Sequence, residues 1–339
     1  PWIGTLSEGI SGNSNGKDFE LFLQNLYMIF EAPRKDQNVL DKNIDSWRTN
    51  IKTQQSSPDF KFSLRAAHLK YPKDKRSIFA LEEKHLSEMQ IDEMYSIFTE
   101  RFNNAADFTF YFVGNIDIEN ALPLIEKYIG GLPSTQKKET WIDRSSPFAT
   151  GVINETVYAG IDEKSKFTIS TCMPFEWNTK NLLAVSLLNN IIKIKLTEEI
   201  RENLGGTYGV GFGLSTQKLP QEKIYMNIQL GCEPSRIDEL TNAIFNVIDE
   251  IAANGPTAID LEKAQKQLCR AREVSIKNNN TWLSWLNNLY DYKEPLMTLD
   301  EYSSQINALT IEDLKKAAIY LKHDSYVRVV LMPENMQKK

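Results

Sequence analysis

The sequence contains few of the residues from which metal sites are built. Its three histidines, His68, His85 and His323, are far apart, and no two of them lie within one helical turn. His85 and Glu88 occupy the first and fourth positions of an H-x-x-E-H zinc helix, but Met89 stands where the second histidine would be. Because a thioether is a poor zinc ligand beside imidazole, we expect no metal site in this chain. We expect the segment around His85 to be a charged loop.

Nucleophile and phosphate-binding motifs are absent as well. Cys172, Cys232 and Cys269 form no C-x-x-C pair, which disfavours a thiolate metal site and predicts buried free thiols. The sequence has neither G-x-S-x-G nor G-x-x-x-x-G-K-[ST]. The glycines at positions 209, 211 and 213 alternate at strand period and do not lead into a helix, which disfavours a dinucleotide loop. We therefore predict no catalytic residue in this chain.

Long apolar runs and an excess of basic charge are also missing. The longest apolar runs are far shorter than the roughly 20 residues that cross a bilayer, so no membrane span is expected. A net charge of -6, spread evenly, argues against a nucleic-acid surface. No export signal opens the chain, which starts at Pro1 and which we expect to be a piece of a longer polypeptide. The compartment stays open, with the periplasm as one candidate for the parent.

Apolar and charged residues occur in the proportions of a soluble globular protein, and 339 residues suffice for two domains. Strand-like runs alternate with amphipathic helices, which predicts an α+β fold. Helices are expected at residues 18–30, 39–52, 91–102 and 118–128, with a strand at 107–113. Further on, strands are expected at 224–230 and 326–331, and helices at 237–251, 259–276, 281–292 and from 309 onward.

The same order of elements occurs twice, offset by roughly 220 residues, which indicates an internal duplication. The second copy has about 70 further residues at 151–222, where we expect two strands, a long helix and a glycine-bearing strand. The first copy has almost no such segment, because Ile10 is already expected in its matching strand. We therefore predict a first domain at 1–132 that lacks its opening strands and helix, a polar linker at 133–148, and a second domain at 149–335.

The most informative segment is residues 201–211, where a long apolar helix stops at two glycines and a glycine-spaced strand follows. The apolar arc of that helix is too broad for a surface helix, so we expect it to pack on a sheet. Gly205 and Gly206 permit the left-handed turn that ends it, and the strand glycines allow another backbone to approach. Two interpretations are open. Arg201 and Tyr208 either serve the helix dipole and the strand, or they contact a bound peptide.

Residues 200–208, Ile-Arg-Glu-Asn-Leu-Gly-Gly-Thr-Tyr, resemble the arginine-to-tyrosine segment in the C-terminal half of pitrilysin-type, insulinase-like zinc peptidases. Residues 107–115 and 128–133 resemble the end of the preceding domain in that family, and residues 30–34 its first inter-helix turn. The likeness covers nearly the whole chain in order. It implies two tandem homologous α/β sandwich domains like those of mitochondrial processing peptidase. Their sheets would be mixed but mostly antiparallel, with helices on one face and the first domain truncated.

In that family the N-terminal half of the same polypeptide carries H-x-x-E-H and binds zinc. The resemblance therefore implies that this chain is most of the non-catalytic half, inactive alone, with zinc bound in the missing half of the parent. Arg201, Gly205, Gly206 and Tyr208 match the family's substrate-binding segment, in which the arginine and tyrosine reach the bound peptide and its scissile carbonyl. Two rivals stay open. One is a catalytically dead scaffold or partner subunit of a peptidase-like complex, and the other is an unrelated small-molecule-binding module.

Overall fold

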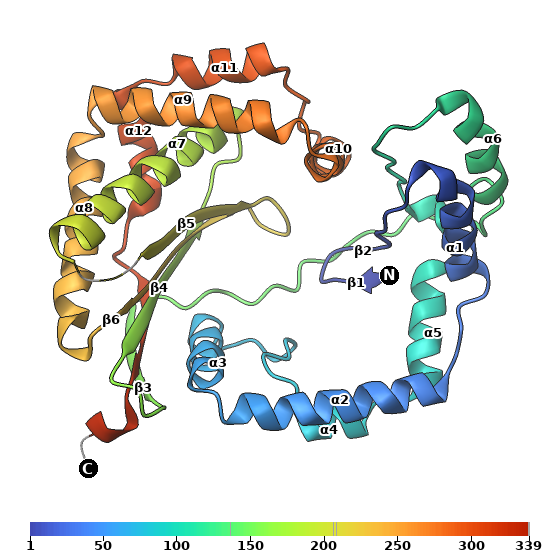
Figure 1. The fold of residues 1–339 in the computed structure, drawn as a ribbon, viewed down its shortest axis with the longest axis horizontal. Helices are drawn as coiled ribbons and strands as arrows, with labels where there is room; N and C mark the ends of the chain where they lie inside the picture. Colours follow the sequence, from blue (N-terminus) through green and yellow to red (C-terminus); the bar gives the residue numbers. More distant parts are fainter. Residues whose placement is uncertain (136, 206, 208, 338–339) are drawn as a thin grey trace. The chain divides into compact units, whose positions relative to one another are not determined.

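The computed structural model describes residues 1–135, 137–205, 207 and 209–337 (Figure 1). By its internal contacts the chain divides into two compact units. Unit 1 comprises Pro1–Lys52, Leu81–Arg144 and Asn278–Glu294, and unit 2 comprises Thr53–Ala80, Ser145–Lys277 and Pro295–Lys339. The domain limits at residues 132 and 149 remain sequence-based predictions. Among the described residues, no helix is both long enough and apolar enough to cross a membrane.

Unit 2 is built on a five-stranded sheet with the order β3-β7-β4-β6-β5. Its strands are β3 (Val152–Tyr158), β4 (Ser165–Pro174), β5 (Val210–Gln217), β6 (Lys223–Cys232) and β7 (Tyr326–Met332). β3 and β7 pair in parallel, and the other neighbours are antiparallel. The predicted mixed, mostly antiparallel sheet is thus confirmed. The strands expected at 224–230 and 326–331, and the three strands expected within 151–222, are confirmed as well.

One face of this sheet is covered by helices (Figure 1). α7 (Thr179–Leu196) and α8 (Ile237–Asn254) lie against the strands, and α9 (Ala258–Ser275), α11 (Leu299–Ala308) and α12 (Ile311–Ala317) pack on them. Alternate strand residues point to this layer, including Phe167, Ile169 and Ile228, and they meet Leu187 and Ile191 of α7. Each buried aliphatic side chain contributes about 1.5–3 kcal/mol. The prediction that the long apolar helix packs on a sheet is confirmed.

The opposite face of the sheet is covered in part by one more helix, α3 (Pro58–Lys70). Phe62 and Ala66 of α3 pack on Val327, Val329 and Leu331 of β7. Two ion pairs also join α3 to the sheet. They join Arg65 to Glu155 of β3 with an Nη2–Oε2 distance of 2.7 Å, and Lys166 of β4 to Asp59 at 2.5 Å. α3 covers β3 and β7, which leaves the same face of β6 and β5 outside this contact.

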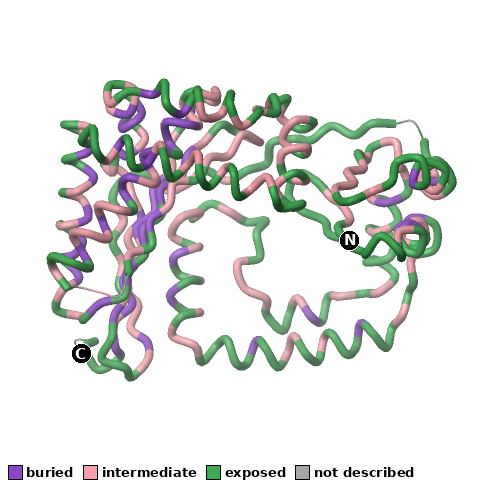
Figure 2. The backbone as a smooth tube through the Cα atoms, turned by 45° about the horizontal axis from the view of Figure 1, so that its top comes forward, coloured by how far each residue is buried: buried purple, intermediate pink, exposed green. Residues whose placement is uncertain are grey.

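Unit 1 consists mainly of helices. They are α1 (Phe19–Glu31), α2 (Gln37–Gln55), which continues into unit 2, α4 (Glu83–Ser87), α5 (Ile91–Phe102), α6 (Ile118–Tyr128) and α10 (Asn279–Tyr292). Two short strands, β1 (Trp2–Ile3) and β2 (Glu8–Gly9), pair in antiparallel fashion. The helices expected from the sequence are confirmed within a few residues at each end. Buried residues are sparser along these helices than in the sheet of unit 2 (Figure 2).

The strand predicted at residues 107–113 is wrong. A short 3-10 turn at Ala105–Asp107 is followed by a segment without regular structure. Phe108, Phe110 and Phe112 nevertheless pack into the core of unit 1, and the rings of Phe30 and Phe108 lie 5.2 Å apart. A strand needs a neighbouring strand for its backbone hydrogen bonds, and none pairs with this segment in the described part of the chain. For the same reason Ile10 lies just beyond β2 and not in a longer strand.

Candidate functional site

Helix α7 passes directly into a π-helical turn, η3 (Thr197–Asn203), which carries Arg201. At its end the backbone N–H of Leu204 donates to the carbonyl of Glu199 at 3.0 Å, which is the five-residue spacing of a π-helix. Ile200 anchors the turn, because its side chain is fully buried in the core under the sheet. The sequence did not predict this turn. Short π-helical segments often occur at functional sites.

The chain turns away from the helix at Gly205, whose φ of 57° lies in the left-handed region. This confirms the left-handed turn predicted there, which glycine adopts without steric cost. The carbonyl of Leu204 accepts a hydrogen bond from Arg236 Nη2 at 3.1 Å, and Arg236 is itself held by Glu239 at 2.8 Å. Sequence reasoning missed Arg236. Arg236 lies 32 residues from Leu204 in the chain, so no local pattern connects the two. Its position just before α8 was the only signal in the sequence.

Arg201 is exposed on this anchored turn. Its guanidinium makes no ion pair and no side-chain hydrogen bond to any residue that the structure describes. A cation at the end of a helix interacts favourably with the helix dipole, so the plainer interpretation stays open. The same cation is also free to bind a ligand. Gly206 and Tyr208, the other predicted members of this site with Gly205, lie outside the described residues.

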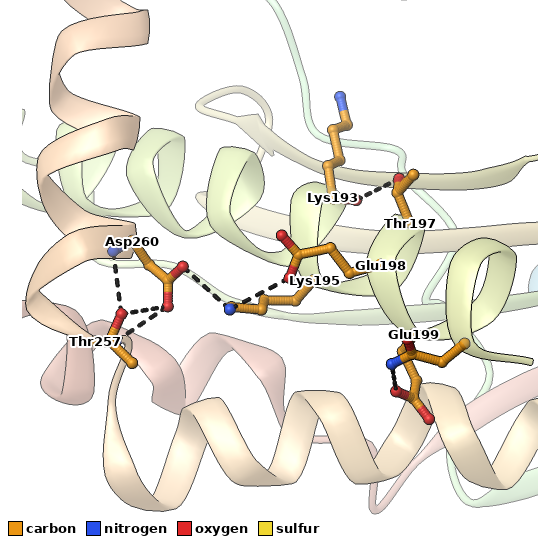
Figure 3. A network of polar contacts seen from close by, with 8 residues as sticks. Lys193, Lys195, Thr197, Glu198, Glu199, Thr257 and Asp260 are labelled. Atoms are coloured by element: carbon orange, nitrogen blue, oxygen red, sulfur yellow. Dashed lines mark hydrogen bonds and ion pairs between the residues drawn. The ribbon is translucent and has the colours of Figure 1, made fainter.

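A polar network connects the end of α7 to the start of α9 (Figure 3). Lys195 Nζ lies 3.1 Å from Asp260 and 3.4 Å from Glu198 of the π-helical turn. Asp260 and Thr257 form a capping box at the start of α9, with a hydroxyl-to-carboxylate distance of 2.7 Å. Burial alone would raise the pKa of Asp260, but hydrogen bonds from Thr257 and Lys195 outweigh it and lower that pKa. The network fixes the position of the turn that carries Arg201.

Beyond this corner, β5 forms one edge of the sheet and alternates between two faces. Phe212 is buried toward the helices, and Gly211 and Gly213 face the other way. A Cβ atom placed on Gly209 or Gly213 would meet no heavy atom within 4 Å. Packing inside the chain therefore does not require glycine at these two positions. This supports the expectation that another backbone approaches the strand here.

The three histidines have packing or capping roles. The ring of His68 lies edge-on to Phe79 at 4.9 Å, and the ring of His323 stacks on Phe245 at 4.2 Å. His85 Nδ1 accepts a hydrogen bond from the backbone N–H of Glu82 at 2.9 Å, in the capping box of α4. The loop predicted around His85 is therefore wrong, because reciprocal capping stabilises a short helix. Among the described residues, no three His, Cys, Asp or Glu side chains form a group that could hold a metal ion.

The three cysteines are free thiols. Cys232 is buried, and burial raises its pKa to about 11. Cys172 and Cys269 are half-buried, where the sequence predicted full burial. Cys172 faces the partly covered side of the sheet, beside Tyr225.

The sequence and the fold of this chain are both similar to those of known proteins. Residues 89–268 match the family described as the peptidase M16 inactive domain. Over 337 residues the chain is 23% identical to the probable zinc protease PqqL of Haemophilus influenzae, with 94% of this chain and 35% of that protein covered. The fold resembles that of the periplasmic protease PqqL from Escherichia coli, with a TM-score of 0.79, 20% identity, and 94% of this chain and 35% of that chain covered.

The first half of the same Escherichia coli protease also has a similar fold, with a TM-score of 0.69, 13% identity, and 94% of this chain and 71% of that chain covered. These likenesses confirm the predicted fold class and the predicted resemblance to pitrilysin-type zinc peptidases. This chain spans about a third of the length of the PqqL relatives it matches, 35% of one and 30% of another.

Proposed function

The chain belongs to the family described as the peptidase M16 inactive domain, and we propose that it is the substrate-binding and transition-state-supporting half of a zinc metalloendopeptidase that acts on peptides. The observation that carries this proposal is the exposed guanidinium of Arg201 on an anchored turn, with no ion pair or hydrogen bond to the described residues. The turn leads through Gly205 into a strand whose glycines leave open space on one face. A cation beside an accessible strand suits the carbonyl groups of an extended peptide.

Arg201 and Tyr208 would act on the peptide bond under attack. In this mechanism Arg201 binds a peptide carbonyl, and the hydroxyl of Tyr208 donates to the oxygen on which negative charge develops. Donors that contact this oxygen accelerate the reaction because they bind the transition state better than the substrate. Removing one such donor costs about 3–4 kcal/mol in known cases. Gly205 and Gly206 would hold the two residues at the corner between helix and strand.

The residues that the structure describes do not fit a zinc ion, since the three histidines serve packing and capping. We therefore assign the zinc ion, its bound water and the general base to an N-terminal half of the same polypeptide. The two halves would close around the peptide, so that neither is active without the other. A separate first half of similar fold in the Escherichia coli protease supports this arrangement. The periplasmic description of that protease supports a periplasmic parent for this chain.

A peptidase assay with separate halves tests the proposal. We expect the present chain with added zinc to hydrolyse no peptide, and the N-terminal half alone to hydrolyse peptides weakly. Mixing the two halves should restore turnover. Turnover by the present chain alone would contradict the proposal.

A catalytically dead scaffold is the second candidate, and the family's description as an inactive domain favours it. The two candidates differ in the residues upstream of Pro1. The presence of H-x-x-E-H in the parent sequence supports the peptidase, and its absence supports the scaffold.

A further inference from the structure

The sheet face that α3 covers in part extends over β6 and β5, where the ring of Phe148 lies 6.4 Å from that of Tyr225. Side chains that point to this face on β6 are Lys223, Tyr225, Asn227 and Gln229, and the last two are exposed. On β5 the same face carries Gly211, Gly213 and Ser215. Apart from Lys223 at the start of β6, these positions are uncharged. Its exposed part, at Asn227 and Gln229 with Gly211 and Gly213 beside them, is therefore an uncharged, hydrogen-bonding strip.

One rung of the sheet across this strip joins Ser170, Asn227 and Gly213. Ser170 is almost fully buried on β4, and its hydroxyl donates to Asn227 Oδ1 at 2.9 Å. This bond uses the carbonyl oxygen of the amide, so its NH₂ group remains available as a donor. The NH₂ group has no acceptor among the described residues. Next to it, the space above Gly213 is empty within 4 Å of an added Cβ.

The neighbouring rung pairs Gln229 with Gly211, where an added Cβ would meet the backbone carbonyl oxygen of Gln229 at 3.3 Å. The amide of Gln229 is exposed and has no hydrogen-bond partner in the described part of the chain. Asn227 and Gln229 are two residues apart on one strand, so their side chains are separated by about 6.6 Å along it. Carbonyl groups on one side of an extended peptide recur at the same spacing. The spacing of the two side-chain amides therefore matches that of the carbonyl groups along an extended peptide, and it does not suit a single charged group.

We propose that Asn227 and Gln229, with Gly211 and Gly213 beside them, bind the main chain of an extended peptide across the open face of β6 and β5. The amides donate to peptide carbonyl groups, and the glycines let the peptide lie close to the sheet. Ser170 is a positioning residue that sets the orientation of Asn227. This inference rests on the proposed function, because it concerns the same peptide substrate, and it adds recognition that is independent of peptide side chains.

Peptide binding by the whole 339-residue chain tests the inference. The probe is a fluorescein-labelled peptide that repeats Ser-Val-Thr-Ala, and its affinity is measured by fluorescence anisotropy. The variants are Gly213→Ala, Asn227→Ala and Arg201→Ala, with Gln55→Ala on an exposed part of α2 as the control. A second probe carries N-methyl groups at alternate peptide bonds, which hinders close main-chain approach without changing the side chains. Thermal melting of each variant reports whether it folds.

We expect Gly213→Ala and Asn227→Ala each to weaken binding about five-fold or more, the effect of one lost hydrogen bond or of a blocked approach. The melting temperature of Gly213→Ala should not fall, since the space at Gly213 is open and alanine is favoured over glycine in a strand. Asn227→Ala also removes the acceptor of the buried Ser170 hydroxyl, so we expect it to melt a few degrees lower but to remain folded. The N-methylated probe should bind weakly to the unchanged chain. Gln55→Ala should bind like the unchanged chain.

Normal binding by Gly213→Ala and Asn227→Ala would overturn the inference, and so would equal binding of the N-methylated probe. If Arg201→Ala alone weakens binding, the inference fails and the proposed role of Arg201 stands. If the strip variants weaken binding and Arg201→Ala does not, the inference stands and that role fails. An unchanged chain that binds no probe up to millimolar concentration would contradict both.

Discussion

Arg236 Nη2 donates a hydrogen bond to the backbone carbonyl of Leu204 at 3.1 Å, and this contact ties the start of α8 to the turn that follows Arg201. The bond joins two segments that are 32 residues apart. Together with the Lys195–Asp260 contact at 3.1 Å, it holds the π-helical turn from two sides. The turn is therefore a fixed support for Arg201, and each anchor can be tested separately.

Replacing Arg236 by alanine should loosen the turn without unfolding the chain. The lost bond to the Leu204 carbonyl contributes about 1 kcal/mol, and the exposed pair with Glu239 contributes less. We expect faster hydrogen exchange at the amide of Leu204, which donates to the carbonyl of Glu199 in the unchanged chain. Arg270→Ala is the matched control, because Arg270 pairs with Glu273 at 2.6 Å in the same i,i+3 spacing but contacts no turn. Equal exchange in both variants would show that Arg236 does not anchor the turn.

Ile200 supports the same turn from below. Its side chain is fully buried, so Ile200→Ala should lower the free energy of unfolding by about 2–5 kcal/mol. Ile259→Ala on α9 should change it by less than about 0.5 kcal/mol, since that side chain is 64% exposed. Urea unfolding of both variants measures the difference. A small loss at Ile200 would mean that the turn is not packed as described.

Asp313 gives the stability of unit 2 a defined pH dependence. A hydrogen bond from Lys180, followed by those from Thr310, lowers the pKa of Asp313 from 3.8 to about 2. Because the pKa is lower in the folded state, the stabilisation is present above about pH 4 and is lost as the pH falls toward 2. Lys180 is largely exposed, so we expect about 1–2 kcal/mol.

The measurement is the free energy of unfolding of the unchanged chain and of Asp313→Asn between pH 6 and pH 2. The difference between the two should be constant above about pH 4 and should shrink below it. Asp162→Asn, at an exposed position, serves as the control. A difference that stays constant down to pH 2 would disprove the assigned ionisation.

The aromatic segment at residues 108–113 should become a strand when its neighbours are present. In unit 2 the matching strand β7 lies between β3 and β4, and both of these precede it in the chain. We therefore expect the backbone amides of residues 109–113 to exchange hydrogen more slowly in the full-length parent than in this chain. Equal exchange rates would argue against the predicted loss of opening strands from the first domain.

The sequence was sufficient to predict structure that depends on neighbouring residues in the chain. The broad apolar arc of α7 predicted its burial, and the glycine pair predicted the left-handed turn at Gly205. The sequence did not predict structure that depends on contacts between residues far apart in the chain. The aromatic run at 107–113 suggested a strand, but the sequence cannot reveal whether a partner strand exists. The contact between Ser170 and Asn227 depends on strand register, and the bond from Arg236 depends on how α8 packs. The π-helical turn likewise escaped prediction, because four- and five-residue hydrogen bonding leave similar side-chain patterns.

The central claim is that Arg201 and Tyr208 act on the peptide bond under attack, and turnover of the full-length parent tests it most directly. Tyr208→Phe and Arg201→Ala should each lower kcat by about 100- to 1000-fold while zinc content and melting temperature stay unchanged. Gln55→Ala, far in sequence from this segment, should have normal turnover. Normal turnover in both Tyr208→Phe and Arg201→Ala would contradict the claim.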